Sequence, residues 1–302
     1  MAIIEAKANS DNPLTGIILM LFAFFIFSLI DVNAKWLSLI GIPALQLAFM
    51  RYIGHFVIST SLISRGGLSL SRFGTTHVGL VLLRGFLLMI STVFNFIAVQ
   101  YISLTLTATI LFSAPIMICA LSWPLLGERV GIWRWSAILV GFFGILIAMR
   151  PFDGDFHMAT ILSLMGALCF ALYQLLTRKL SGLVASETMQ FYTGFVGTAA
   201  LLPIAVLVWE SPETGFAWAQ MIALGIFGWI GHEMLTRAHR YAPSSTLSPF
   251  GYTFILYMTI WSFIVFDQMP DKWTILGAAI IIVAGLVIWF REAHIAKRRL
   301  AA

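Results

Sequence analysis

Long stretches of apolar residues alternate with short polar segments along the whole chain. The sequence contains ten apolar blocks, and each is close to the ~20 residues that a helix needs to cross a bilayer. The blocks are residues 14–35, 43–63, 78–100, 105–125, 133–149, 158–176, 189–208, 216–236, 245–266 and 273–290. Because the blocks show no alternation of period two, they do not suit a membrane β-barrel. The pattern predicts an all-α polytopic membrane protein with ten transmembrane helices.

Composition supports this class. Of the 302 residues, 60% are hydrophobic and 10% are charged, whereas soluble domains carry about 25% charged residues. The polar first 13 residues and the long block that follows do not resemble a cleavable signal peptide. Both cysteines, Cys119 and Cys169, fall inside blocks without metal-ligand spacing. We therefore expect no disulfide, no metal site and no cofactor.

The positive charges predict the orientation in the membrane. With both termini in the cytoplasm, thirteen Lys and Arg residues lie inside, three (Lys35, Arg150 and Lys272) lie outside, and Arg51 and Arg84 lie within spans, which accounts for all 18. Cytoplasmic loops carry an excess of positive residues. The net charge of +5 is thus explained by the membrane and requires no nucleic acid. We predict a multi-pass protein of the inner membrane with both termini cytoplasmic.

A weak internal repeat divides the chain. Residues 96–129 align with residues 236–269, so that Thr105 meets Ser245 and Ser113 meets Thr253. We expect two halves, residues 1–150 and 151–302, with five spans each. Because five is odd, the second half enters the membrane from the opposite side, and the repeat is inverted. Many secondary transporters have this organisation, with the substrate site where the halves meet.

Several short motifs recur in order over almost the whole chain. They are Leu83-Arg84-Gly85, Pro115, Gly127-Glu128-Arg129, Trp135 with Gly141 and Gly144, Ala242-Pro243, Ser248-Pro249-Phe250, Pro270-Asp271-Lys272-Trp273 and Gly277. In this order the sequence resembles the drug/metabolite transporter superfamily, in particular its ten-helix branch with paired five-helix repeats. The resemblance implies a carrier similar to bacterial S-adenosylmethionine or riboflavin carriers, or to the amino-acid exporters of the same fold. Gln268 departs from the glutamate that the family usually repeats there.

Four ionisable residues fall inside predicted spans: Asp31, Arg51, Arg84 and Glu233. A charge at mid-bilayer costs about 2.5–3.5 kcal/mol and usually faces a partner or water. Their depths along the helices predict two pairs, Asp31 with Arg51 and Arg84 with Glu233, each near one gate. These residues are our candidates for gating or coupling. The alternative is that the pairs only orient helices, or that Arg84 extends to the inner surface.

Polar and aromatic residues near mid-span are the candidates for binding cargo. Two prolines, Pro115 and Pro249, interrupt corresponding spans of the two halves, which points to a transporter site, although a simple kink is the common alternative. The predicted substrate-binding residues come from both halves and are Asn95, Ser113, Tyr173, Gln174, Tyr252 and Tyr257. Membrane Ser and Thr residues also serve in helix packing.

The function that fits best is a secondary carrier of a small organic metabolite, working by alternating access and without catalytic residues. No phosphate-binding loop is present. The four buried charges cancel, so a neutral, zwitterionic or mildly cationic cargo is expected, with lipid and cargo as partners, no nucleic acid, and a homodimer left open. The alternatives are an amino-acid or drug exporter of the same fold, an intramembrane enzyme, or a non-transporting membrane subunit.

Overall fold

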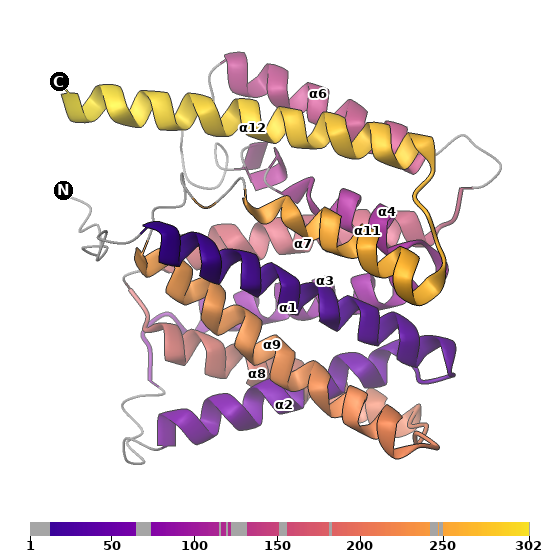
Figure 1. Ribbon diagram of the computed structural model, residues 1–302. Coiled ribbons are helices and arrows are strands. Elements are labelled where there is room, and N and C mark those ends of the chain that lie inside the picture. Colours follow the sequence, from indigo (N-terminus) through magenta and orange to yellow (C-terminus); the bar gives the residue numbers. More distant parts are fainter. Residues whose placement is uncertain are drawn as a thin grey trace.

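The predicted helices are present in the structure, a computed structural model. It describes residues 13–64, 74–114, 116–118, 120–121, 132–150, 156–180, 183–241, 247 and 250–301. Ten α-helices lie within these residues: α1 (Pro13–Leu39), α2 (Ala44–Ser64), α3 (Val78–Tyr101), α4 (Leu104–Leu111), α6 (Ile132–Met149), α7 (Ala159–Leu180), α8 (Ser186–Leu207), α9 (Gly215–Tyr241), α11 (Thr253–Phe266) and α12 (Lys272–Ala301). They run side by side, so that α1 begins and α12 finishes at one end of the bundle, here called the terminal end (Figure 1).

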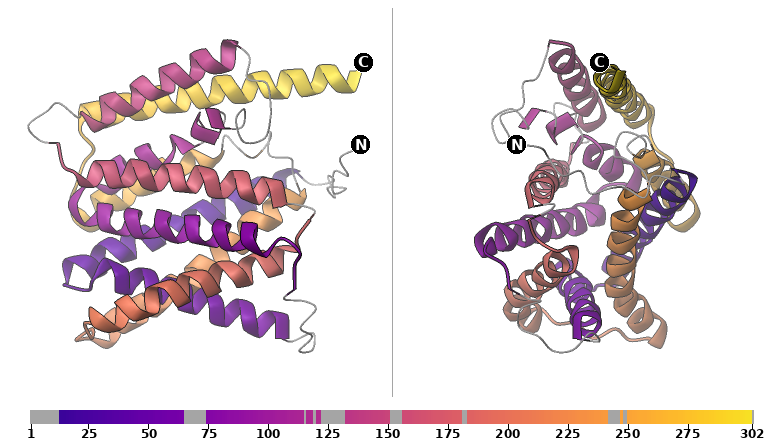
Figure 2. Two further views of the ribbon diagram at one scale, coloured as in Figure 1. Left: turned by 180° about the vertical axis from the view of Figure 1, so that it is seen from behind. Right: turned by 90° about the vertical axis from the view of Figure 1, so that its left-hand side faces the viewer.

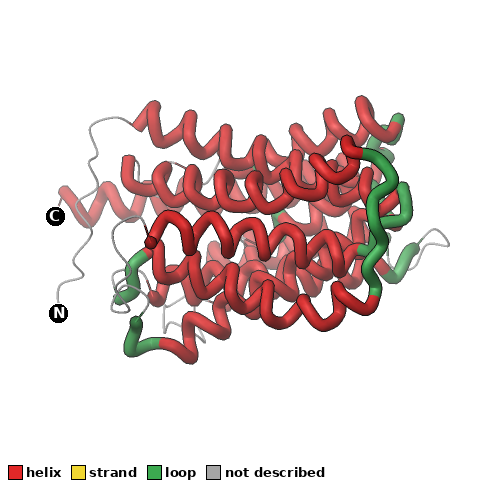
Figure 3. The backbone as a smooth tube through the Cα atoms, turned by 90° about the horizontal axis from the view of Figure 1, so that it is seen from below, coloured by secondary structure: helices red, strands yellow, loops and turns green. Residues whose placement is uncertain are grey.

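Half of the described helices have the length and composition of membrane spans. Among the described residues, five helices are long and apolar enough to cross a bilayer, and three shorter apolar helices accompany them. The remaining two, α2 and α9, carry buried polar residues such as His55 and His232. Large apolar side chains cover much of the outer surface, as expected where a protein faces lipid. The chain is an all-helical polytopic membrane protein, and the described helices and the links at their ends are seen from below in Figure 3.

The helices of the two halves pack in reciprocal pairs. Taken in order, α7, α8, α9, α11 and α12 correspond to α1, α2, α3, α4 and α6. The most extensive packing joins α1 to α9 and α3 to α7, which exchange when the halves are exchanged. Corresponding helices also pack on each other: α2 on α8, α4 on α11, and α6 on α12 at one edge of the bundle (Figure 2). This reciprocity is what two inverted repeats produce, and contacts within either half are less extensive.

Two glycine contacts show the same symmetry at atomic detail. A Cβ on Gly85 would lie 3.3 Å from the Tyr192 carbonyl oxygen, and a Cβ on Gly225 would lie 3.1 Å from the Met50 carbonyl oxygen. Gly85 and Gly225 are corresponding residues of the repeat, as are Met50 and Tyr192. Close backbone approach at small residues is typical of helix packing in membranes. The α2–α9 and α3–α8 crossings are therefore equivalent.

Two side chains join the halves at the end opposite the termini. Lys35 Nζ donates to the Ile102 carbonyl oxygen (2.9 Å) and to Gln268 Oε1 (3.1 Å). The Gln46 side chain bonds to both the backbone N–H and the carbonyl oxygen of Glu210, each at 2.8 Å. The topology places Lys35 among the outer cations, but α1 continues to Leu39 and buries it, with 3% of its surface exposed. Both contacts hold the two halves together at this end of the bundle.

Helix ends near the two interrupting prolines differ from a continuous span. Helix α4 stops at Leu111, and Phe112 is its C-cap, so the predicted span 105–125 is not one unbroken helix. Helix α11 begins at Thr253. Pro115 and Pro249 themselves lie outside the described residues.

The start of α12 is held by a charged cap. Asp271 Oδ1 accepts from the backbone N–H groups of Trp273 (2.8 Å) and Thr274 (2.9 Å), and Arg150 lies 3.6 Å from Oδ2. Partial burial raises the pKa of Asp271, but these hydrogen bonds and the Arg150 charge outweigh it, and the net pKa is below the usual value.

Candidate functional site

Asp31 and Asn95 form a buried pair between the first and third helices. Asn95 Nδ2 donates to Asp31 Oδ1 at 2.9 Å, and Asp31 is 6% exposed. Sequence reasoning assigns Asp31 to a gate and Asn95 to the cargo, and the structure places them in direct contact. A buried carboxylate must be hydrogen-bonded or paired to be tolerated, and Asn95 supplies one such bond.

Arg51 of α2 lies between corresponding residues of the two halves. Its Nη1 donates to Thr92 Oγ1 on α3, and its Nη2 lies 3.4 Å from His232 Nε2 on α9. Thr92 and His232 are 140 positions apart, the offset of the repeat at residues 96 and 236. Tyr52 adds a hydrogen bond to Thr92 at 2.8 Å. Arg51 therefore sits where the pseudo-two-fold axis of an inverted repeat passes.

Asp31 and Arg51 are neighbours without forming an ion pair. The charge of Arg51 acts on Asp31, but Asp31 takes its hydrogen bond from Asn95, and Arg51 donates to Thr92. A buried acid and a half-buried base thus lie on one polar path through α1, α2, α3 and α9. In this arrangement neither charge neutralises the other by direct contact.

Arg84 has a full set of partners on the second half. Its Nε donates to Thr177 Oγ1 (2.7 Å), Nη1 to Thr193 Oγ1 (2.8 Å) and to the Met189 carbonyl oxygen (3.2 Å), and Nη2 to the Tyr173 hydroxyl (2.8 Å). The guanidinium also lies 4.5 Å from the centre of the Tyr173 ring. Arg84 is 3% exposed. Its role in the structure is to hold α3 against α7 and α8.

The predicted Arg84–Glu233 pair is wrong. Glu233 instead forms an ion pair with Arg237 at 2.8 Å, one turn further along α9. Their side chains are 28% and 57% exposed. Depth along the helices matched Arg84 with Glu233, but depth alone carries no information about which face each helix turns toward the other.

The predicted cargo residues separate into four groups. Asn95 belongs to the Asp31 pair, and Tyr173 to the Arg84 network, with Gln174 half-buried beside it on α7. Ser113 Oγ donates to the Ile110 carbonyl oxygen at 2.5 Å, which serves the end of α4. The remaining two, Tyr252 and Tyr257, are half-buried in aromatic contacts.

An aromatic layer lines the helices α1, α4 and α11. Phe24 packs on Phe112 (5.7 Å between ring centres) and on Phe254 (6.0 Å), and Tyr252 packs on Phe112 (5.6 Å). Tyr257 lies edge-on to Phe25 at 5.6 Å. The phenylalanines of this layer are not among the predicted site residues. In a chain that is mostly apolar, the sequence does not distinguish a phenylalanine near the site from one that faces lipid.

Thr92 and His55 are further residues of the site that the sequence analysis did not single out. The repeat contained a usable signal for Thr92, because it aligns with His232. His55 lies one turn beyond Arg51 on α2, its ring centre is 6.0 Å from that of His232, and it is 3% exposed. The position of His55 on α2 shows that it belongs to the site only when the neighbouring helix, α9, is known.

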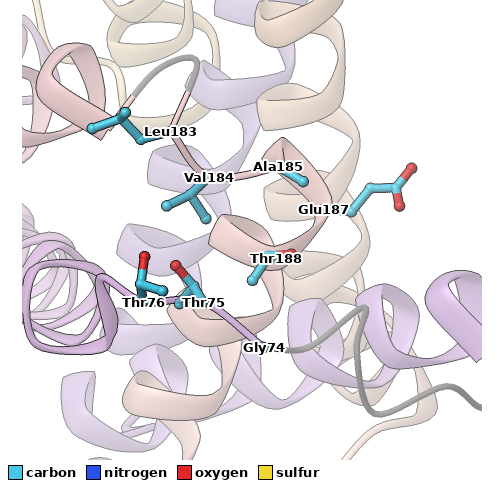
Figure 4. Close-up of a pocket in the computed structure, with 8 residues that line it drawn as sticks. All are labelled: Gly74, Thr75, Thr76, Leu183, Val184, Ala185, Glu187 and Thr188. Atoms are coloured by element: carbon cyan, nitrogen blue, oxygen red, sulfur yellow. The ribbon is translucent and has the colours of Figure 1, made fainter.

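A surface hollow at the terminal end is separate from these residues. It has a volume of about 300 Å³ and lies between the start of α3 and the start of α8. Figure 4 shows its lining, which includes Thr75, Thr76 and Thr188 and none of the predicted site residues. The buried polar path, and not this hollow, contains the candidate site.

Comparison with known proteins gives consistent matches over nearly the whole chain. The profile of the EamA-like transporter family matches residues 14–150 and 157–290. A riboflavin transporter of Vibrio cholerae is 28% identical over 294 residues, covering 96% of this chain and 98% of the relative. An S-adenosylmethionine uptake transporter of Rickettsia felis is 27% identical over 287 residues, covering 95% and 96%.

Two further matches extend the comparison. A pseudopaline exporter of Pseudomonas aeruginosa is 26% identical over 275 residues, covering 91% of this chain and 95% of the relative. A crystal structure with 17% identity aligns over 90% of this chain and 96% of its own, with a TM-score of 0.64. At that identity the match supports the fold alone.

Proposed function

The chain belongs to the EamA-like transporter family, and on that premise we propose that it is a secondary transporter of a small organic metabolite that works by alternating access. The observation that carries the proposal is the position of Arg51. It contacts corresponding residues of both halves, Thr92 and His232, beside the buried Asp31–Asn95 pair. Inverted-repeat transporters hold their cargo at this kind of midplane interface between repeats.

Alternating access requires that one end of the bundle opens while the other is closed. The Lys35 and Gln46 contacts join the halves at the end opposite the termini, so they suit a state in which that end is shut. The equivalent α2–α9 and α3–α8 crossings provide two surfaces that can exchange roles. Opening one end breaks a few hydrogen bonds, and closing the other end forms new ones. Cargo binding can shift the equilibrium between these two states.

The proposed orientation places the terminal end in the cytoplasm of a bacterial cell, with the protein in the inner membrane. The support is the excess of Lys and Arg in links at that end. Lys179 lies exposed at the terminal end, and Glu213 lies exposed at the opposite end. In a cysteine-free background, Lys179→Cys should react with an impermeant thiol reagent only after cell lysis, and Glu213→Cys in intact cells. The reverse pattern would overturn the orientation.

The charges of the buried path refine the expected cargo. The sequence analysis balances two acids against two bases, but Glu233 is engaged with exposed Arg237, and Lys35 is buried. One acid, Asp31, therefore remains with three bases on the helices: Lys35, Arg51 and Arg84. Among the predicted cargo classes, a zwitterion suits this surplus better than a cation does. The direction of transport is left open, and so an amino-acid or drug exporter of the same fold remains the alternative.

Counterflow in proteoliposomes tests this proposal and separates a carrier from an enzyme or a scaffold subunit. Vesicles loaded with unlabelled riboflavin, S-adenosylmethionine or a mixture of amino acids receive the labelled compound outside. We expect saturable uptake with at least one probe and its loss in Asp31→Asn. If vesicles without the protein take up every labelled probe as well as vesicles that contain it, the proposal is contradicted.

A further inference from the structure

We propose that Arg51 and His55 form the subsite for a carboxylate group of the cargo, so that the transported metabolite carries a carboxylate. The two residues are one turn apart on α2 and share a face of that helix. The inference rests on the proposed transport function, since it assigns a chemical group to the same site. It is carried by unpartnered donors, by the balance of buried charge and by the position of Arg51.

Both residues hold polar atoms without a protein partner. Arg51 Nε and His55 Nε2 are buried and make no hydrogen bond to any described residue. Leaving a buried donor unsatisfied costs about 1–3 kcal/mol, and more when the group is charged. A carboxylate oxygen would accept from Arg51 Nε, and a second oxygen would accept from His55 Nε2 when the ring is protonated on both nitrogens, since the side chain and backbone of Gln190 also bond to His55. The vacant hydrogen-bonding capacity therefore matches one ligand group.

Buried charge points to the same chemistry. Asp31 is the acid whose charge acts on Arg51, yet it bonds to Asn95. Lys35 and Arg84 bond to carbonyl, amide and hydroxyl oxygens, which carry no charge. Among the described residues, Asp31 is the acid beside Arg51, while Arg84 also acts on His55, so positive charge is in excess in this region. An uncompensated buried charge is costly, and an anionic group of the cargo would compensate it.

Among the described residues, the Nε edge of the Arg51 guanidinium has no hydrogen-bonding partner. Tyr52 covers a face, with its ring centre 5.3 Å from Cζ, and Thr92 and His232 contact the two terminal nitrogens. On the Nε side the neighbour is Gly228 of α9, where a Cβ would lie 3.5 Å from Nε. The absence of a side chain at Gly228 keeps this edge free. Arginine binds carboxylates through such an edge with two parallel hydrogen bonds.

The carboxylate requirement discriminates between compounds named for the relatives. S-adenosylmethionine carries a carboxylate, whereas riboflavin does not. Purified protein in detergent would be titrated with S-adenosylmethionine and decarboxylated S-adenosylmethionine, and with methionine and methioninamide, while riboflavin serves as the uncharged probe. Thermal unfolding reports binding because a ligand that binds only the folded state raises its stability. We expect at least one carboxylated member to bind more tightly than its matched partner.

Variants then assign the effect to the subsite. Arg51→Gln should weaken binding of the carboxylated probe about 10- to 100-fold, as expected for hydrogen bonds to a charged group. The affinity for the matched compound without a carboxylate should not change. Gly228→Ala adds a methyl group at ordinary contact distance, so the protein should fold while the Nε edge is covered and affinity falls. Arg237→Gln removes an exposed arginine as the matched control and should bind as wild type does. His55→Asn should give an intermediate loss.

The outcomes separate this inference from the transport proposal. The subsite is overturned if no carboxylated probe stabilises the wild-type protein, or if Gly228→Ala and Arg51→Lys keep the full carboxylate preference. Counterflow that succeeds without any carboxylate preference rejects the subsite and keeps the transporter. Carboxylate-dependent binding without counterflow rejects the transporter and keeps the subsite.

Discussion

Arg51 and Arg84 are two arginines inside the same apolar bundle, but their surroundings differ. Arg84 gives four hydrogen bonds to α7 and α8 and stacks on Tyr173. Arg51 donates to Thr92 and approaches His232, and its Nε has no partner among the described residues. An arginine whose N–H groups all have protein acceptors holds helices together in a membrane bundle. An arginine with an unpaired N–H group can still donate to a ligand.

The repeat explains why the two differ. Arg84 corresponds to Leu224, and Arg51 corresponds to Thr193. At the α3–α8 crossing, Arg84 therefore meets Thr193, which accepts its hydrogen bond. At the equivalent α2–α9 crossing, the arginine is on the other helix, and the residue that takes the place of Arg84 is Leu224, a buried side chain with no acceptor. The same packing produces a closed network in one crossing and an open one in the other.

Replacement of the two arginines by glutamine should break the comparison most strongly. Arg84→Gln removes four hydrogen bonds at roughly 0.6–1 kcal/mol each in a membrane protein, so we expect a loss of about 2–4 kcal/mol of stability. Arg51→Gln removes an incompletely paired charge and should change stability by less than about 1 kcal/mol. Thermal unfolding of both purified variants measures the difference. Equal destabilisation would show that Arg51 also holds helices together.

Asp31→Asn separates charge from geometry at the open network. The amide keeps an oxygen that can accept from Asn95, so folding should be retained while the charge beside Arg51 is lost. We expect a decrease of roughly tenfold or more in transport, equivalent to about 1.4 kcal/mol, with near-normal expression. Counterflow and size-exclusion chromatography measure the two effects. The double variant Asp31→Asn with Arg51→Gln should fold without transporting; full transport in it would reduce both residues to packing.

The fold followed from the apolar blocks because a helix needs about 20 apolar residues to cross a bilayer. All ten predicted blocks overlap described helices, and the odd number of spans per half required the inversion. Contacts between polar residues were harder to predict. The depth of a residue can be counted along its helix, but the sequence does not give the rotation of the helix about its axis. Thus Asp31 and Arg51 were placed near each other, while Glu233 was matched with Arg84 and instead contacts Arg237.

The predicted cargo residues show the same limit. Ser113 and Tyr173 are predicted to bind cargo, but the hydroxyl groups of both already bond to the protein. Thr92 was the residue that the repeat could have revealed, because it aligns with the buried His232. Lys35 was assigned to the outer surface because the apolar block ends there, whereas the helix continues another turn and buries it.

Two tyrosines that are equivalent as sequence candidates should now behave differently. Tyr173→Phe deletes a hydroxyl that accepts from Arg84 Nη2, so we expect a loss of about 1 kcal/mol or slightly more in stability, because the acceptor serves a charged donor. Tyr252→Phe keeps the ring contact with Phe112 and should be close to neutral. Thermal unfolding measures both. If Tyr252→Phe instead raises the half-saturation concentration for transport, its hydroxyl touches the cargo as the sequence suggests.

Thr193→Val is the smallest change that makes the closed crossing resemble the open one. Valine keeps the shape of threonine but removes the oxygen that accepts from Arg84 Nη1 at 2.8 Å. The same nitrogen keeps its bond to the Met189 carbonyl oxygen at 3.2 Å, so the loss should be about 0.6 kcal/mol, an average value for one hydrogen bond within a membrane. Combining Thr193→Val with Tyr173→Phe should cost more than the sum, because Arg84 would then keep only two of its four hydrogen bonds, to Thr177 and to the Met189 carbonyl oxygen, and losses within one hydrogen-bond network are coupled. Strict additivity in thermal unfolding would indicate that water or lipid headgroups supply the missing acceptors, and that saturation by protein groups is not what distinguishes Arg84 from Arg51.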